Sequence, residues 1–290
     1  MCKRLFAILL AVTLICFSAA AVHADDSSIT LYGFSFTING DGKAVIHSYD
    51  NRSSDVVIPK ALLGAEVVEI DDYAFFGNTD IKSVSFENCD GLKKIGTNAF
   101  YGCTGIKDIT IPSSVNELGF GAFQNCSSLE NVTIENGITS LPKQLFYNCE
   151  SLKSVVIPES VESIENGAFA NCPSLREIEI PDSVTSIDKN AFKNSNKLII
   201  FCNEGSPAAE IARENGMNYR VIKEFELGDV NLDGKINIRD ATIIQLSKVG
   251  REVIPVYHGK HYADVNRDGK VTVRDVTLIQ MKIAKIINSF

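Results

Sequence analysis

The chain has 290 residues, of which 45% are hydrophobic and 22% are charged, with a formal net charge of −8 at pH 7. This length and apolar content suffice for one large or two smaller folded domains and exclude a disordered or fibrous chain. The acidic balance, without a long run of Lys or Arg, excludes nucleic acid as the main partner, because phosphate binding needs clustered positive charge. Residues 25–226 are strongly acidic, whereas residues 227–290 carry more basic than acidic residues, so the two parts differ in kind.

The first residues have the pattern of a secretory leader. Lys3 and Arg4 precede an apolar run over residues 5–17, and small residues lead to Ala24. This pattern predicts a signal peptide over residues 1–24, cleaved after Ala24. Because no later stretch approaches the roughly eighteen apolar residues of a spanning helix, we expect a secreted, extracellular protein without a membrane span.

A repeat fills the middle of the chain. Its marker is a Phe preceded by Ala or Leu, and the six copies are Phe75, Phe100, Phe123, Phe146, Phe169 and Phe192. The spacing is 25 residues and then 23 four times. This period lies in the range of leucine-rich repeats, and six copies are enough to bury a continuous core by stacking. The sequence therefore predicts a solenoid.

Each repeat also contains a short alternating apolar segment. In one copy Ile109 and Ile111 alternate with polar residues and Pro112 follows, which predicts a strand with one buried face that ends at the proline. Stacked at roughly 4.8 Å per rung, such strands form parallel sheets and align the Phe residues in one internal row.

The repeat wording resembles the BspA-like class of bacterial leucine-rich repeats. The resemblance rests on Ala-Phe-x-x-Cys, and on Ile-Pro-x-Ser-Val at residues 111–115 and 157–161, and it covers about residues 29–222. Asn39-Gly40-Asp41-Gly42, between alternating segments, is similar to the hairpin cap of such arrays. Ser206-Pro207 followed by residues 208–215 and Gly216 is similar to a capping helix with a glycine stop.

Four of the six cysteines after the leader share one repeat position, at Cys103, Cys126, Cys149 and Cys172. Neighbouring rungs would bring them close enough for disulfides. Side chains at equivalent positions point the same way, however, and a buried thiol is a common small filler. We therefore favour stacked free thiols.

The outward strand positions form a polar ladder that becomes acidic at Glu177 and Glu179. This face is either a contact surface for a protein or glycan ligand, or a solvated face that keeps the solenoid soluble. The sequence alone does not decide between these two interpretations of the face.

Two segments after Phe225 match each other at an offset of 35 residues. Residues 229–240 read Asp-Val-Asn-Leu-Asp-Gly-Lys-Ile-Asn-Ile-Arg-Asp, and residues 264–275 read Asp-Val-Asn-Arg-Asp-Gly-Lys-Val-Thr-Val-Arg-Asp. Oxygen ligands at loop positions 1, 3, 5, 9 and 12, with Gly at position 6, have the spacing of an EF-hand calcium loop. The duplication predicts two calcium ions as cofactors.

Each ion is assigned six ligand residues, with a backbone carbonyl at the Lys position and Asp in place of the usual Glu at position 12. The first set is Asp229, Asn231, Asp233, Lys235, Asn237 and Asp240, and the second is Asp264, Asn266, Asp268, Lys270, Thr272 and Asp275. Behind the loops, apolar residues at helical spacing predict helices over residues 241–249 and 276–287. Without a full entering helix, each unit is half of an EF-hand.

This arrangement resembles a type I dockerin over about residues 226–288. The resemblance implies a small all-α domain with two half EF-hand calcium loops, which docks to a cohesin module of a scaffoldin in a cellulosome or a similar polysaccharide-degrading assembly. Loop positions 10 and 11 are then the cohesin contacts, here Ile238, Arg239, Val273 and Arg274. The near-symmetry of the halves implies two opposite docking poses.

These elements predict a β-rich leucine-rich-repeat solenoid of parallel strands with a short capping helix, followed by the dockerin. The expected divisions are residues 1–24 for the signal peptide, 25–57 for the N-terminal β cap, 58–200 for the solenoid, 201–223 for the C-terminal cap and 224–290 for the dockerin. We expect a monomer.

The leading hypothesis for function is a non-catalytic secreted protein whose solenoid binds a protein or polysaccharide and whose dockerin attaches it to a scaffold. One alternative is a surface adhesin with a structural calcium domain. Another is an unrecognised polysaccharide-degrading enzyme, which the sequence disfavours because the acidic residues repeat along solvent faces without an insertion to form a cleft. A nucleophile triad is disfavoured because His47, in the cap, is the only histidine of the repeat region.

Overall fold

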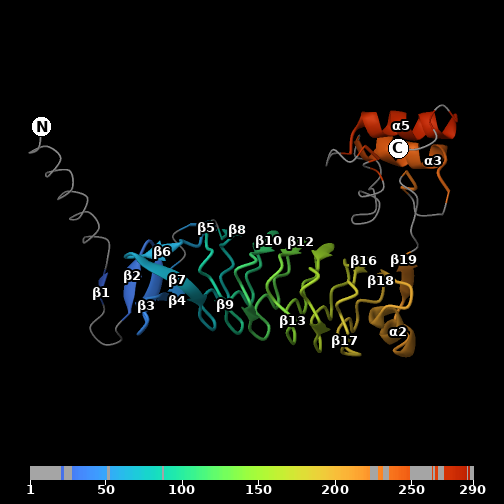
Figure 1. The fold of residues 1–290 in the computed structure, drawn as a ribbon. Helices are drawn as coiled ribbons and strands as arrows, with labels where there is room; N and C mark the ends of the chain where they lie inside the picture. The colour runs from blue at the N-terminus through green and yellow to red at the C-terminus, as the bar shows by residue number, and fades with distance from the viewer. Residues whose placement is uncertain are drawn as a thin grey trace, which may run out of the picture. The chain divides into compact units, whose positions relative to one another are not determined.

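The computed structural model describes residues 21–22, 28–50, 53–86, 88–222, 228–230, 235–248, 263, 265–266, 271–285 and 287. The chain divides into two compact units, one made of residues 1–200 and 205–219 and the other of residues 201–204 and 220–290. The first unit is a β solenoid, and the second contains a pair of helices (Figure 1).

An antiparallel hairpin begins the solenoid. Its strands are β3 (Phe34–Ile38) and β4 (Ala44–Tyr49), and the turn is fixed by Asn39, whose Oδ1 accepts hydrogen bonds of 3.0 Å from the backbone N–H groups of Asp41 and Lys43. Strand β2 (Ile29–Leu31) pairs with β3, and β1 (Ala21–Val22) pairs with β2. The rest of the predicted signal peptide lies outside the described residues.

Strand β4 then pairs in parallel with β7 (Ala65–Ile70), which begins the stacked array. A short antiparallel hairpin joins β6 (Ala61–Leu62) to β7. The row of longer strands contains β5 (Asp55–Val57), β8 (Ser83–Ser85), β10 (Asp108–Ile111), β12 (Asn131–Ile134), β14 (Ser154–Val156) and β16 (Glu177–Glu179). The row of shorter strands contains β9 (Lys94–Ile95), β11 (Glu117–Leu118), β13 (Ser140–Leu141), β15 (Ser163–Ile164) and β17 (Ser186–Ile187).

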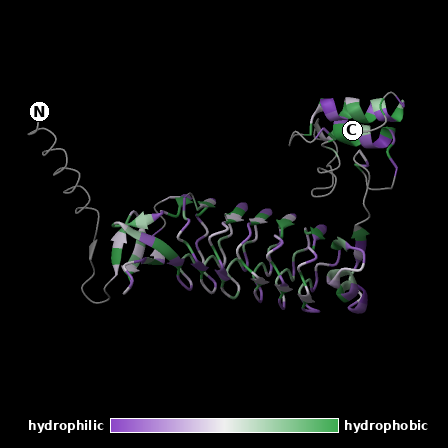
Figure 2. Ribbon diagram, in the orientation of Figure 1, coloured by the Kyte–Doolittle hydropathy of each residue, from purple (hydrophilic) through white to green (hydrophobic). Residues whose placement is uncertain are grey.

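The rungs stack in the register that the repeat predicts. Asp108 pairs with Asn131, and Asn131 pairs with Ser154, so each step advances 23 residues along the chain. Strands β10 and β12 alternate between exposed and buried residues, and polar and apolar residues alternate along the rungs (Figure 2). The predicted parallel solenoid is therefore confirmed.

Phenylalanine rings form the centre of the core. Successive ring centroids along the ladder from Phe75 to Phe192 are 4.7, 5.3, 5.6, 5.6 and 5.6 Å apart, with nearly parallel planes. The ladder extends into the cap through Tyr49, whose ring centroid is 5.7 Å from that of Phe75, and then through Phe34 at 5.0 Å from Tyr49. The aromatic column thus joins the cap to the repeats.

Each rung turns after its Phe through a residue with positive φ. Asn125, Asn148, Asn171 and Asn194 have φ values of 58–64°, and Gly102 occupies the same place in an earlier rung. Asn and Gly are the residues that adopt this left-handed conformation most easily. The Asn148 amide donates a 2.9 Å hydrogen bond to Oδ1 of Asn125, so the turns are also joined between rungs.

The six described cysteines are buried and keep their thiols; they are Cys89, Cys103, Cys126, Cys149, Cys172 and Cys202. The four at the shared repeat position stack as predicted, and each thiol donates to the backbone carbonyl of a Phe in the rung before it, as Cys103 does to Phe75 at 3.1 Å. Burial raises the pKa of Cys103 and of Cys172 to about 12. These thiols are therefore protonated donors in the folded solenoid.

The last rung is followed by helix α2 (Pro207–Glu214). Ser206 caps its N-terminus by accepting a 3.2 Å hydrogen bond from the backbone N–H of Ala209, and Gly216 follows the helix with φ 64°. Strand β18 (Ile199–Asn203) precedes the helix and β19 (Tyr219–Ile222) follows it. Within the described residues, no helix has the length and apolar character of a membrane-spanning segment.

Candidate functional site

Two helices of equal length carry the candidate metal and docking residues. They are α3 (Ile238–Lys248) and α5 (Val273–Ile283), and each begins three residues before the helix expected from the apolar pattern. Helix α5 also ends at Ile283 instead of at residue 287, because Ala284 caps it and Lys285 has φ 60°. In α5 the early start has a local cause, a capping box between Thr272 and Asp275.

The last Asp of each loop occupies the first turn of its helix and is fully buried. Asp240 accepts hydrogen bonds from the backbone N–H groups of Val230, at 2.9 Å, and Asn237, at 2.8 Å. Asp275 accepts from the N–H groups of Asn266, at 3.4 Å, and Thr272, at 2.7 Å. In both halves one carboxylate thus ties the start of the loop to the start of the helix.

The first loop brings a second acid to the same place. Asp229 is 1% exposed and precedes Val230, whose N–H donates to Asp240. Two carboxylates are therefore buried within one short loop, and burying negative charge is costly unless a cation or donors compensate it. A hard divalent cation with oxygen ligands fits this donor set.

The other predicted ligands divide into described and undescribed residues. Asn237 Oδ1 accepts from the backbone N–H of Arg239, at 2.9 Å, and its Nδ2 donates to the carbonyl of Lys235, at 3.2 Å. Thr272 has the equivalent place, with its Oγ1 accepting from the N–H of Arg274 at 3.2 Å. Outside the described residues lie Asn231, Asp233, Asp264, Asp268 and Lys270.

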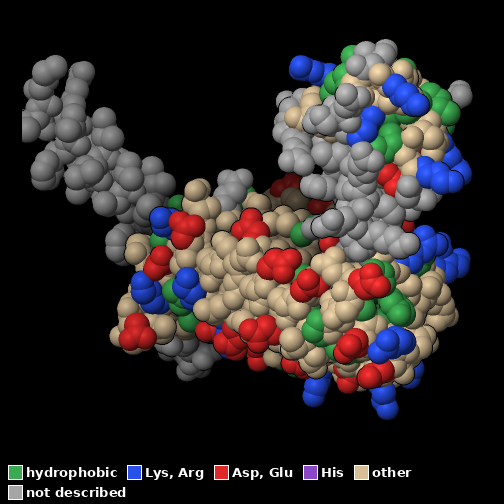
Figure 3. Space-filling model, turned by 45° about the vertical axis from the view of Figure 1, so that its right-hand side comes forward, with side chains coloured by type: hydrophobic (Ala, Val, Ile, Leu, Met, Phe, Trp, Pro, Cys, Tyr) green, Lys and Arg blue, Asp and Glu red, His purple; other side chains and the backbone are tan. Residues whose placement is uncertain are grey.

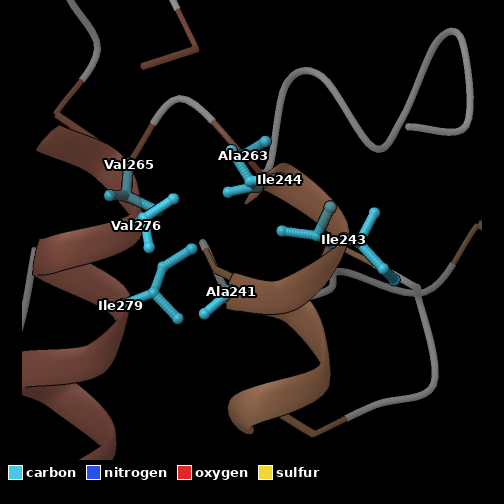
Figure 4. Close-up of a cluster of buried hydrophobic side chains, with 8 residues drawn as sticks. Ala241, Ile243, Ile244, Ala263, Val265, Val276 and Ile279 are labelled. Carbon is cyan, nitrogen blue, oxygen red and sulfur yellow. The ribbon is translucent and has the colours of Figure 1, made fainter. Parts of the chain in front are cut away.

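A shared apolar core holds the two halves together, and its members are related by the same offset of 35 residues (Figure 4). The pairs are Val230 with Val265, Ala241 with Val276, and Ile244 with Ile279, completed by Ile243 and Ala263. Each buried Asp therefore lies in the first turn of its own helix, and the buried faces of the two helices pack against each other.

The four predicted docking residues lie in the first turns of the two helices, and all are exposed. Ile238 is 61% exposed and Val273 is 69% exposed. Arg239 and Arg274 follow them at equivalent positions. An exposed aliphatic side chain next to an arginine is typical of a contact surface, and here the pair occurs twice.

Sequence reasoning missed a side-chain relay in the N-terminal cap. Thr37 Oγ1 lies 2.8 Å from His47 Nε2, and His47 Nδ1 lies 2.7 Å from Asp71 Oδ2. The three residues are far apart in sequence, so only the sheet register of β3, β4 and β7 joins them. Asp71 Oδ1 also accepts from the backbone N–H of Asp72 at 2.8 Å. We interpret this partly exposed relay as a cross-link between strands.

The repeat surface carries a hollow of about 520 Å³ beside strands β8 and β10. Asp90, Asp108 and Glu135 are among its lining residues, and Glu135 accepts a 2.9 Å hydrogen bond from the backbone N–H of Ser113. Acidic side chains are also spread over the visible face of the solenoid (Figure 3). The burial of Glu179, reinforced by the neighbouring charge of Glu159, raises its pKa to about 7.

The solenoid with its helical pair defines a protein assembled from two modules of different fold. Residues 68–199 match the model of the BspA type leucine rich repeat region in six copies, and residues 227–284 match the model of the dockerin type I domain. The chain therefore carries a BspA-type leucine-rich repeat region followed by a type I dockerin domain. Both are non-catalytic binding modules, and type I dockerins bind calcium and dock to cohesins.

Solved structures similar to this chain come from bacterial leucine-rich repeat proteins. A leucine rich cell surface protein from Faecalibacterium prausnitzii A2-165 is 31% identical, with a TM-score of 0.51, and the match covers 60% of this chain and 54% of that one. A leucine-rich repeat protein from Eubacterium ventriosum ATCC 27560 is 22% identical, with a TM-score of 0.43, over 55% and 49% of the two chains. The chain thus spans about half the length of these two proteins. No curated protein matches it.

Proposed function

We propose that this protein is a secreted, non-catalytic adaptor. Its leucine-rich repeats bind a polysaccharide or protein ligand, and its dockerin attaches it to a scaffoldin cohesin in an extracellular polysaccharide-degrading complex. The observation that carries the proposal is the duplicated arrangement of Asp240 and Asp275, each buried at the start of a helix and followed by the same apolar core. The repeat match and the dockerin match support the two halves of this role.

Calcium is the proposed control element. We assign two ions, held by the two sets of six residues given above, and the cation offsets the repulsion between carboxylates that each loop gathers. Because a domain of this size has a small core, metal binding contributes directly to its folding. Removing calcium is expected to unfold the dockerin and to release the cohesin.

The proposed cohesin contacts are Ile238 with Arg239 and Val273 with Arg274. Their exposure in the first turns of α3 and α5 supports this role, since the ions hold those turns in place. The two sets are related by the internal repeat, so a cohesin can engage either one with the dockerin turned around.

The test is a pull-down of the full chain with a panel of immobilised cohesins, with calcium and with a chelator. We expect retention by at least one cohesin with calcium and release by the chelator, with magnesium as the control cation. Circular dichroism should report loss of helix on chelation while the solenoid signal persists. Retention that ignores calcium would overturn the metal-dependent docking.

A second candidate is a surface adhesin whose calcium domain only stabilises its end. The similarity to a leucine rich cell surface protein favours it. Calcium-dependent folding without retention by any cohesin in the panel would support this second function.

A further inference from the structure

Where the chain turns around each Phe, the solenoid has an edge lined by side chains, which we call the turn edge. The row of larger side chains along this edge is interrupted at one rung. Two positions in each rung lie along this edge, and they are occupied in turn by Tyr73 and Phe76, Asn98 and Tyr101, Gly121 and Gln124, Gln144 and Tyr147, Gly167 and Ala170, and Asn190 and Lys193. Backbone hydrogen bonds from Asn148 to Ala170, at 2.9 Å, and from Asn171 to Lys193, at 2.8 Å, align the last three rungs. Only the rung of Gly167 and Ala170 has small residues at both positions.

The missing side chains leave a notch of about 260 Å³. Gln144 and Tyr147 form one wall, Asn190 and Lys193 form the other, and the buried Gly167 and Ala170 lie between them. A Cβ atom on Gly167 would lie 3.3 Å from Gln144 Cγ and 3.8 Å from Tyr147 Cδ2, so this wall stands directly beside the glycine.

The notch has room for one ring. Its walls come from rungs two steps apart, which are about 9.6 Å from each other at the spacing of parallel strands. A ring in van der Waals contact with both walls needs about 7–8 Å. A sugar or another six-membered ring therefore fits between the walls, whereas the neighbouring edge positions are filled by larger side chains.

The lining is rich in neutral amides. Besides Gln144 and Asn190 it includes Asn171 and Asn194, and Asn194 Nδ2 donates to Asn171 Oδ1 at 2.8 Å. Each amide both donates and accepts hydrogen bonds, which matches the hydroxyl groups of a sugar. Tyr147 adds an aromatic ring on which an apolar sugar face can pack.

The charges in the notch favour binding without hydrolysis. Among the described residues that line the notch, Lys193 alone is charged, so these residues do not include the pair of carboxylates that glycoside hydrolysis requires. Asp188 accepts a 3.1 Å hydrogen bond from Nδ2 of Asn166, another amide of the lining.

We propose that the notch between Tyr147 and Lys193 binds one pyranose unit of a neutral polysaccharide. The proposal rests on the proposed function. Of the two ligand classes given there, it selects polysaccharide, and it adds the site at which the polysaccharide binds. Tyr147 packs against the ring, and the amides of Gln144, Asn171 and Asn190 bond its hydroxyls.

The test is affinity electrophoresis of the full chain in gels that contain soluble xylan, glucomannan or mixed-linkage β-glucan. We expect retardation in at least one of them. Tyr147→Ala should weaken binding at least tenfold. Ala170→Gln should abolish it by filling the notch, and the fold should accept this change because Gln124 follows Gly121 in the same way two rungs earlier.

The control is Thr133→Ala, which alters an exposed position of strand β12 and should leave retardation unchanged. Melting temperatures of all variants check that the solenoid remains folded. If both notch variants bind within twofold of the wild-type protein, the site is overturned while the proposed function stays intact. Loss of retardation in Thr133→Ala alone would have the same meaning. Absence of retardation in every gel would overturn the sugar proposal, whereas cohesin capture of the same samples tests the docking half separately.

Discussion

The thiol of Cys126 donates a hydrogen bond to the backbone carbonyl of Phe100, across 3.2 Å and one rung of the solenoid. Cys149 makes the same bond to Phe123 at 3.3 Å, and Cys172 makes it to Phe146 at 3.2 Å. At the end of the series Ser195 replaces the thiol, and its hydroxyl donates to Phe169 at 2.8 Å. From Cys103 to Ser195 this repeat position therefore holds a small buried donor.

We expect Cys126→Ala to destabilise the solenoid more than Cys126→Ser. Alanine removes one of two donors to the buried Phe100 carbonyl, which still accepts from the backbone N–H of Cys103 at 3.2 Å. The loss is therefore about 0.5–1.5 kcal/mol, the net value of one hydrogen bond, whereas serine preserves a donor of the kind already present at Ser195. Chemical denaturation of both variants measures the difference. An equal loss for the two substitutions would reduce the thiol to a space filler.

Stability should fall at alkaline pH. The pKa of Cys103 rises from 9.0 to about 12 on folding because burial penalises the thiolate. Below pH 9 the thiol is protonated in both states and its contribution is complete. Between pH 9 and 12 only the unfolded chain ionises, so stability decreases by about 1.4 kcal/mol per pH unit for this thiol.

Denaturant midpoints at pH 8 and pH 10.5 measure this effect. Cys103→Ser is the matched control, because it removes the titrating thiol while other ionisations remain. The variant should lose less stability between the two pH values than the wild-type protein. Equal slopes would contradict the assignment of the pH dependence to Cys103.

The phenylalanine ladder should be most sensitive at its centre. Phe123 is fully buried, with neighbouring ring centroids at 5.3 and 5.6 Å, so Phe123→Ala is expected to cost about 3–5 kcal/mol. Phe192 stands at the end of the ladder and is partly exposed, so Phe192→Ala should cost less. Thermal melts compare the two variants, and a larger loss at Phe192 would place the stabilising centre elsewhere.

Each buried loop Asp should control one ion. Asp240→Asn and Asp275→Asn remove a charge and place an NH₂ group against a backbone N–H, so each should weaken calcium binding in its own loop at least tenfold. Calorimetry of the full chain should show the stoichiometry fall from two to one in either variant. Asp108→Asn, on the exposed face of the solenoid, is the control. Two ions bound with unchanged affinity would rule out these ligands.

The two docking surfaces should substitute for each other. Because Arg239 and Arg274 occupy equivalent positions, Arg239→Glu or Arg274→Glu alone should leave cohesin binding within a few-fold of the wild-type value. The double variant should abolish binding. Surface plasmon resonance with the captured cohesin separates these cases, and complete loss in one single variant would restrict docking to one pose.

The repeat period carries most of the information about the fold. The spacing of the Phe residues predicts the stacking register, and the apolar residues at helical spacing behind each loop predict the two helices. The core that the two helices share is known only from the structure. Helix starts are less readable, because Asn237 and Thr272 sit at loop positions and the Thr272 cap is evident only once Asp275 reaches back to it.

Features that depend on neighbouring rungs are not readable from one sequence. The bond from Cys126 to Phe100 joins residues 26 apart, and the cap relay joins Thr37, His47 and Asp71 through sheet register. The notch is an omission of side chains at Gly167 and Ala170, so it has no motif of its own. Such sites emerge only when the rungs are placed side by side.

Equal spacing of the rungs has a consequence for the history of the chain. Since Asp108, Asn131 and Ser154 follow one another at identical register, excising residues 127–149 would join surfaces that already match. Gene segments of this length can therefore be gained or lost without a new interface having to arise. The number of rungs can therefore change while the caps at the two ends of the array stay the same.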